Sequence, residues 1–178
     1  LVLTDGGVIV IGNSSSSEFG PNENQGEKDA VILKTDHDGN TLWQHTYGGS
    51  KEDVILDIKE TSDQGFLAVG YTESKDGDLS ENKGGRDYWI FKIDSQGTLQ
   101  WTKTYGGLLA DEIKSIICNA DGSYTMAIRD SSTGSGDIDV EIMKTDSYGN
   151  IIWDKVYGSY DKDTPKTIYP TNDNGYIV

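Results

Sequence analysis

One polar segment of the chain spaces its oxygen-bearing side chains as a metal-binding loop would. Between residues 74 and 85, every second position from 76 carries one of them: Asp76, Asp78, Ser80 and Asn82. Ca²⁺ prefers such oxygen ligands, and calcium loops present them in this alternation. The match to an EF-hand is partial, because the sixth and twelfth positions are Glu81 and Asp87 rather than Gly and Glu. These four residues are our candidate Ca²⁺ ligands. The alternative is a plain solvated loop, and because the match is partial, this alternative is favoured.

Two series of aspartates also recur along the chain. They are Asp29, Asp87 and Asp139 in one series and Asp53, Asp111 and Asp163 in the other. Converging carboxylates could bind a hard cation. The series recur whatever the neighbouring loop contains, which favours aspartates that accept hydrogen bonds from their own backbone turns. The run Asp36-His-Asp38-Gly-Asn40 is interpreted as a turn for a similar reason, since the other units keep only Asp-x-x-Gly.

The sequence contains no catalytic motif that would define an enzyme. Phosphate-loop, Gly-x-Ser-x-Gly and His-Glu-x-x-His patterns are absent, and the two histidines, His37 and His45, lie in different contexts. Cys118 lies in the run Ile116-Ile-Cys-Asn119 and is interpreted as a small buried hydrophobe. Two acids at a suitable separation would still allow glycoside hydrolysis, and the sequence implies no cofactor beyond a possible Ca²⁺.

Composition narrows the classes of partner. The 178 residues hold 15 Lys and Arg against 30 Asp and Glu, a net charge of −15. Nucleic acids and anionic membrane surfaces attract clustered basic residues, so both are disfavoured, and no apolar run is long enough for a spanning helix. A single cysteine excludes an internal disulfide framework. Aromatic residues make up 10% of the chain, which indicates a folded core.

The chain is an internal repeat. Trp43-Gln-His-Thr-Tyr47-Gly-Gly returns as Trp101-Thr-Lys-Thr-Tyr105-Gly-Gly and as Trp153-Asp-Lys-Val-Tyr157-Gly-Ser. Such self-similarity, here at spacings of 58 and 52 residues between the tryptophans, is typical of repeat architectures. The units run approximately over 7–64, 65–121 and 122–174, with a partial remainder, inside one repeat region covering 1–178.

Each unit is predicted to form four antiparallel strands, named a to d in chain order. In the second unit they cover 54–60, 66–72, 88–93 and 98–105, rich in β-branched and aromatic residues. Strand c is apolar on both faces, so its sheet must be covered on both sides. We therefore predict an all-β fold of propeller blades without helices, and a β-sandwich is the main rival.

The segment 87–107, Asp-Tyr-Trp-Ile-Phe-Lys-Ile-Asp-Ser-Gln-Gly-Thr-Leu-Gln-Trp-Thr-Lys-Thr-Tyr-Gly-Gly, resembles the propeller-type repeats of secreted Bacteroidetes proteins. The loop 74–85 is similar to an insert common in those repeats. The resemblance implies an exported or surface-attached protein, often a cargo of the type IX secretion pathway. It implies no general catalytic activity, so no functional residue of the family is assigned to this chain. The third unit departs from the pattern, with a shorter insert and with Pro165 and Pro170 in strand a.

Three blades are too few for a closed propeller, which typically has four to eight. We expect either a longer chain or closure through self-association, because unpaired sheet edges invite association. The b–c and d–a connections lie at one end of the blades, where the longest loops are 13–28 and 72–86, with a shorter one at 131–136. Long loops on a rigid scaffold are where binding residues usually lie.

Two series of side chains bear on packing. The recurrent tryptophans of strand d, Trp43, Trp101 and Trp153, are expected to pack between blades rather than bind sugars. Trp89 has Val31 and Glu141 as counterparts, so partial exposure is expected there. Each repeated lysine, such as Lys92, is expected to pair on the surface with the aspartate two residues later.

The function hypothesis is a non-enzymatic extracellular or cell-surface module for binding or adhesion, with a protein or glycan ligand. The alternative is a carbohydrate-active enzyme, a hydrolase or lyase, that uses carboxylates on the propeller face. A purely structural spacer in a large surface protein is the third possibility. Neither nucleic-acid binding nor membrane insertion is expected.

Overall fold

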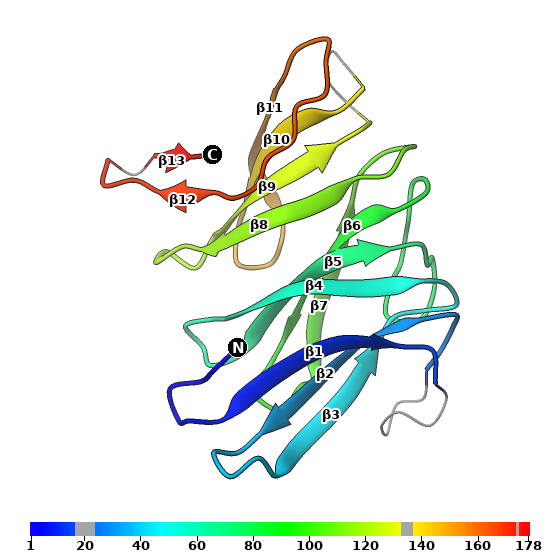
Figure 1. Ribbon diagram of the computed structural model, residues 1–178, viewed down its shortest axis with the longest axis vertical. Helices are drawn as coiled ribbons and strands as arrows, with labels where there is room; N and C mark the ends of the chain where they lie inside the picture. The colour runs from blue at the N-terminus through cyan, green and yellow to red at the C-terminus, as the bar shows by residue number, and fades with distance from the viewer. Residues whose placement is uncertain (17–23, 133–136, 174) are drawn as a thin grey trace. The chain divides into compact units, whose positions relative to one another are not determined.

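The structure is a computed structural model, and it describes residues 1–16, 24–132, 137–173 and 175–178. Within these ranges the regular elements are β-strands, and there is no helix that could cross a membrane (Figure 1). The strands are β1 (Val8–Ser14), β2 (Asp29–Thr35), β3 (Thr41–Tyr47), β4 (Asp53–Glu60), β5 (Phe66–Thr72), β6 (Asp87–Ile93), β7 (Leu99–Tyr105), β8 (Glu112–Cys118), β9 (Tyr124–Asp130), β10 (Asp139–Thr145), β11 (Ile151–Tyr157), β12 (Tyr169–Pro170) and β13 (Tyr176–Ile177).

The strands form open antiparallel sheets that match the predicted blades. Blade 1 is the three-stranded sheet β1-β2-β3, blade 2 is β4-β5-β6-β7 and blade 3 is β8-β9-β10-β11, with β12-β13 as a short further pair. The ladders pair each strand with its neighbour in sequence, for example Val8 with Thr35 and Phe66 with Glu60. None of these sheets closes into a barrel. The all-β, propeller-like prediction is confirmed, and the strand bounds in blade 2 agree with the expected ranges within one residue.

Each turn between strands c and d is built by one aspartate and one glycine. The Asp36 Oδ1 atom accepts hydrogen bonds from the backbone N–H groups of Asp38 at 2.9 Å and Asn40 at 2.8 Å. Gly39 then adopts a φ of +85°, and Gly97 and Gly149 adopt similar positive values in the other blades. Such a backbone conformation favours glycine. The run starting at Asp36 is therefore a turn, as interpreted from the sequence.

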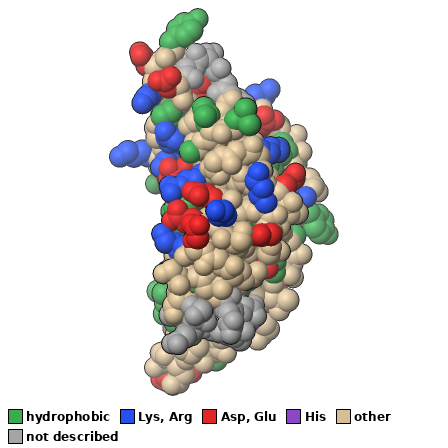
Figure 2. All heavy atoms as spheres, turned by 90° about the vertical axis from the view of Figure 1, so that its right-hand side faces the viewer, with side chains coloured by type: hydrophobic (Ala, Val, Ile, Leu, Met, Phe, Trp, Pro, Cys, Tyr) green, Lys and Arg blue, Asp and Glu red, His purple; other side chains and the backbone are tan. Residues whose placement is uncertain are grey.

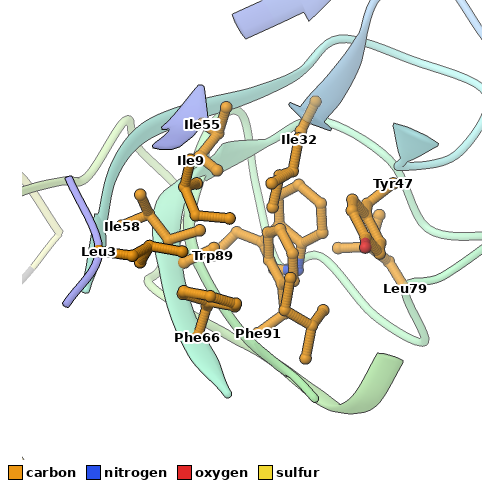
Figure 3. Packing of buried hydrophobic residues seen from close by; sticks show 13 residues of the cluster. Leu3, Ile9, Ile32, Tyr47, Ile55, Ile58, Phe66, Leu79, Trp89 and Phe91 are labelled. Carbon is orange, nitrogen blue, oxygen red and sulfur yellow. The ribbon is translucent and has the colours of Figure 1, made fainter. Parts of the chain in front are cut away.

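The chain divides into two compact units, and the first contains a core made by blades 1 and 2. Unit 1 comprises residues 1–82 and 89–104. Its buried cluster (Figure 3) consists of Leu3, Ile9, Ala30, Ile32, Tyr47, Ile55, Ile58, Phe66, Ala68, Leu79, Trp89, Phe91 and Ile93. Every residue of β6 is buried, so the strand that reads as apolar on both faces is covered on both. The expectation that Trp89 is partly exposed was wrong: it is 0% exposed and stacks on Phe91 at 4.3 Å between ring centroids.

Aromatic residues at the end of strand d join one blade to the turn of the next. In unit 1 the Tyr47 hydroxyl donates to the Gly97 carbonyl at 2.5 Å, and the Trp43 indole N–H donates to the Ser95 carbonyl at 3.0 Å. Tyr47 is only 3% exposed, and its ring lies 5.0 Å from that of Phe91. Trp43 therefore packs between blades, as predicted for the recurrent tryptophans, and Tyr47 packs there beside it.

Unit 2 comprises residues 83–88 and 105–178 and contains blade 3. The Tyr105 hydroxyl donates to the Gly149 carbonyl, the same contact one repeat later, and the Tyr105 ring stacks on Tyr88 at 5.5 Å. Residues 163–168 form no strand before β12, as the proline-interrupted sequence indicates. Cys118 on β8 is half-buried rather than fully buried.

The lysines of strand c pair differently from the expectation. The Lys92 ammonium lies 2.9 Å from a carboxylate oxygen of Asp63, and that of Lys144 lies 3.4 Å from Asp121. Both partners belong to the turn between strands a and b, not to the aspartate two residues along strand c. Lys92 is also buried, so the expected surface pair within strand c was wrong.

We predict that Leu67→Ala destabilises unit 1 far more than Leu42→Ala. Leu67 is fully buried on β5, and removing a buried leucine side chain costs about 2–5 kcal/mol in lost burial and cavity formation. Leu42 is 56% exposed on β3, where truncation costs about 0.5 kcal/mol or less. Urea unfolding of the two variants measures the difference, and equal midpoints would contradict the packing of blade 2.

Candidate functional site

The connection from β3 to β4 is fixed by side chains that accept its backbone N–H groups. We call residues 48–51 the Gly48–Lys51 loop. Its four consecutive N–H groups each donate to one side-chain oxygen: Gly48 to Asp78 at 3.0 Å, Gly49 to Asp53 at 2.7 Å, Ser50 to Asp76 at 2.7 Å and Lys51 to Ser74 at 2.9 Å. Three of the four acceptors come from the long connection between β5 and β6. The two loops therefore hold each other in place at one end of the blades.

The structure gives the four candidate metal ligands separate local roles. Asp76 and Asp78 accept from the Gly48–Lys51 loop, and the Asp78 N–H donates back to the Gly48 carbonyl at 2.9 Å. Asn82 is buried and donates to the Thr72 carbonyl at 2.9 Å, whereas Ser80 is exposed. Among the described residues no three His, Cys, Asp or Glu side chains are grouped as a metal ion requires. Binding of Ca²⁺ by these residues stays a prediction.

The aspartates of the two recurring series cap the loops before them. Asp53 Oδ2 also accepts from the Ser74 hydroxyl at 2.7 Å, and its Oδ1 accepts from Thr72. Each of these aspartates accepts from the N–H four residues earlier, in the pairs Asp29 with Gln25, Asp53 with Gly49, Asp87 with Lys83, Asp111 with Gly107 and Asp163 with Ser159. The backbone-capping interpretation is confirmed for these five. The described residues do not include 133–136, the loop before Asp139.

Burial gives the carboxylates around this loop unusual pKa values. Burial raises the pKa of Asp29 to about 6, against the hydrogen bond from Gln25, and the charges of Asp53 and Asp78 add to the rise. Burial also raises the pKa of Asp53 and of Asp78. A Cβ at Gly48 would lie 2.8 Å from Asp29 Oδ1 and 2.7 Å from Asp53 Oδ2, so only glycine fits between the two carboxylates. The site therefore concentrates buried negative charge beside a glycine backbone.

The surface around these buried acids carries charges of both signs. The Lys28 ammonium lies 2.6 Å from Glu52, and that of Lys51 lies 3.6 Å from Glu27. Figure 2 shows this side of the molecule, with basic and acidic side chains intermixed rather than a uniformly acidic patch. A ligand at this face would meet alternating charges. Residues 17–23 of the first long loop lie outside the described residues.

A buried glutamate in unit 2 was not singled out as a candidate site residue from the sequence. Glu141 lies on β10, buried, at the position that Trp89 occupies in blade 2. Burial raises its pKa to about 7, and the charges of Asp130 and Asp154 add to the rise. The Tyr88 hydroxyl donates to Glu141 Oε2 at 3.4 Å. A charged residue within an otherwise apolar strand was the sequence signal that could have identified it.

Comparisons with known proteins identify one protein similar in sequence and one similar in fold, and neither assigns a function to this chain. No family model matches the chain. The chain is 24% identical over 180 residues to the regulatory protein FlaEY of Caulobacter vibrioides, a match that covers 93% of this chain and 18% of that protein. It also resembles the structure of a Bacteroides caccae protein of unknown function, with a TM-score of 0.55, 11% identity, and coverage of 94% of this chain and 48% of that one. This chain thus spans less than a fifth of FlaEY and about half of the Bacteroides protein.

We predict that Asp29→Asn reduces the loss of stability between pH 4 and 6. An aspartate titrates near pH 3.9 in an unfolded chain, whereas folded Asp29 has a pKa of about 6. Between these values the folded state keeps a proton that the unfolded state releases, so the free energy of unfolding falls as pH rises. One such group contributes at most about 1.4 kcal/mol per pH unit.

Urea unfolding at several pH values measures this slope. Asp36→Asn is the control, because hydrogen bonds from Asn40 lower the pKa of Asp36. Asp36 therefore changes the pH dependence of stability only below the pKa that an aspartate has in the unfolded chain. If Asp29→Asn kept the parent slope, the buried carboxyl would not be protonated in the folded state.

We predict that Asp78→Ala lowers the thermal midpoint equally in EDTA and in excess Ca²⁺. The substitution leaves the Gly48 N–H without its acceptor, which costs about 1–3 kcal/mol whether or not a metal is present. Ser80→Ala is the matched control, since Ser80 is exposed in the same connection. A midpoint of the unsubstituted chain that rises with Ca²⁺, and ceases to rise in Asp78→Ala, would instead assign Asp78 to a calcium site.

Proposed function

We propose that this chain is a non-enzymatic binding or adhesion module that acts outside the cell or at its surface. The contact surface is the end of the blades that carries the long loops, and the ligand is a protein or a glycan. Nucleic acid is disfavoured as a ligand by the net charge of −15. The likeness of the repeats to those of secreted Bacteroidetes proteins supports an external location.

The observation that carries the proposal is the fixed loop at that end of unit 1. The Gly48–Lys51 loop donates its N–H groups to four side-chain oxygens in succession, and the opposing connection supplies three of them. Loops held before binding lose little conformational entropy when a ligand docks, which favours affinity. The exposed side chains of Lys75, Ser80 and Glu81 project from this fixed backbone.

The geometry supports binding better than catalysis. Asp29 and Asp53 beside the Gly48–Lys51 loop accept hydrogen bonds from backbone N–H groups and are buried, so these two carboxylates present little to a substrate. A carbohydrate-active enzyme is the second candidate, and the raised pKa of Glu141 favours it, because a general acid must hold a proton near neutral pH. Glu141 is buried beside Tyr88, which places it away from a substrate unless unit 2 opens.

A polysaccharide panel separates the two functions. We predict that the chain binds at least one soluble bacterial or plant polysaccharide in isothermal titration without releasing new reducing ends over a day. Lys75→Ala should weaken this binding, since Lys75 is exposed on the long connection, whereas Lys103→Ala on β7 should leave it unchanged. New reducing ends that vanish in Glu141→Gln would establish the enzyme instead. Equal effects of the two lysine substitutions would exclude the loop end as the contact surface.

A further inference from the structure

The contact between successive blades has two halves that recur along the chain. One half is the aromatic end of strand d, and the other is the turn between strands c and d in the following blade. Tyr47 meets Gly97 within unit 1, and Tyr105 meets Gly149 within unit 2. Both receiving glycines are buried by this contact. Side chains at three alternate positions of strand d take part, since a Cβ at Gly97 would lie 2.4 Å from His45 and 3.1 Å from Trp43.

Blade 3 presents the first half of this contact to solvent. Tyr157 ends β11 as Tyr47 ends β3, yet its side chain is 56% exposed. Six of the seven residues of β11 are exposed, and only Trp153 is partly covered, with its ring 6.3 Å from that of Tyr176. β11 is also the edge strand of its sheet. Its aromatic end is therefore a donor surface without a receiving turn among the described residues.

Blade 1 presents the second half. Its turn glycine, Gly39, is exposed, whereas Gly97 and Gly149 are buried. On the same blade, an open pocket along β1 and β2 is lined by Val10, Val31 and Leu33, together with neighbouring residues of β1.

The corresponding positions of blade 2, 58 residues on, are Ala68, Trp89 and Phe91. All three are fully buried in the core cluster that contains Tyr47, and the Phe91 ring lies 5.0 Å from the Tyr47 ring. Val31 and Leu33 are smaller than Trp89 and Phe91, so blade 1 leaves room for an incoming aromatic ring. Val10, at the rim of the pocket, is 48% exposed.

The charges of the two halves are complementary. Lys155 on β11 stands at the strand position that His45 occupies in β3, where it would face the turn of the next blade. The exposed turn of blade 1 carries Asp36 and Asp38. A lysine set over two carboxylates favours this pairing and directs its orientation.

We propose that a second copy of this chain docks its β11 end on blade 1, with Tyr157 entering the pocket of Val10, Val31 and Leu33 and donating to the Gly39 carbonyl. The contact repeats between copies the one that joins blades within the chain. The two surfaces differ, so the interface is heterologous and produces a ring or an open chain of copies. This inference is independent of the ligand proposed for the long loops.

Sedimentation equilibrium of the 178-residue chain tests the proposal. The unsubstituted chain should form species that are multiples of 19.5 kDa in a concentration-dependent way. Tyr157→Asp should be monomeric at the same concentrations, because it places a charge in an apolar pocket. Tyr160→Asp is the matched control, since Tyr160 is 89% exposed just beyond β11, and it should associate like the parent.

A mixing experiment tests the heterologous geometry. Leu33→Asp should also be monomeric, yet it keeps an intact Tyr157, while Tyr157→Asp keeps an intact pocket. An equimolar mixture should therefore form a complex of twice 19.5 kDa that neither variant forms alone. Val10→Asp replaces Leu33→Asp if circular dichroism shows that the latter is unfolded. A monomeric parent chain, or association that survives Tyr157→Asp, overturns the proposal, as does a mixture that stays monomeric.

Discussion

Burial of both faces of a sheet is the constraint on which the rest of the molecule depends. β6 is buried at all seven positions, so both faces of blade 2 must be shielded from solvent along this strand. In unit 1 blade 1 supplies one cover, and the aromatic residues of β3 complete it. A tyrosine hydroxyl that must cross to the next blade needs an acceptor there, and the turn glycine offers its carbonyl at close range because it has no side chain. Packing between blades and turn chemistry are thus one requirement.

At the loop end, burial of carboxylates and hydrogen bonding of the loop backbone are likewise one requirement. An aspartate that starts a strand is buried by the fold, and an isolated buried charge is costly. The loop before each strand supplies N–H groups in compensation, as Gly49 does for Asp53 and Gly107 for Asp111. In unit 1 the long connection after β5 adds Asp76 and Asp78 to this arrangement. The connection after β5 therefore stabilises the backbone of the Gly48–Lys51 loop, and its outward side chains are left to contact a ligand.

The repeat pattern predicted the strands, their turns and the packing of Trp43, because these follow from local residue types at a fixed spacing. The predicted partial exposure of Trp89 was wrong. It was inferred from the counterparts of Trp89 in the other units, which are unlike it, and the repeat pattern carries no information on how a larger residue fills the space between blades. Lys92 was assigned to the nearest aspartate along the strand, whereas its partner lies across the sheet on a neighbouring turn. The roles of Asp76 and Asp78 depend on which loop lies opposite, and sequence spacing does not specify that.

The two kinds of aspartate have a consequence for how the protein carries its charge. Turn carboxylates such as Asp36, Asp121 and Asp173 have lowered pKa values because hydrogen bonds stabilise the ionised form. Asp29, Asp53, Asp111 and Glu141 have raised values because burial opposes ionisation. The acids consequently lose their protons over a broad range rather than in one step near pH 4. In mildly acidic surroundings the folded chain is less negative than its formal charge of −15, so its electrophoretic mobility reports the state of its interior as well as its surface.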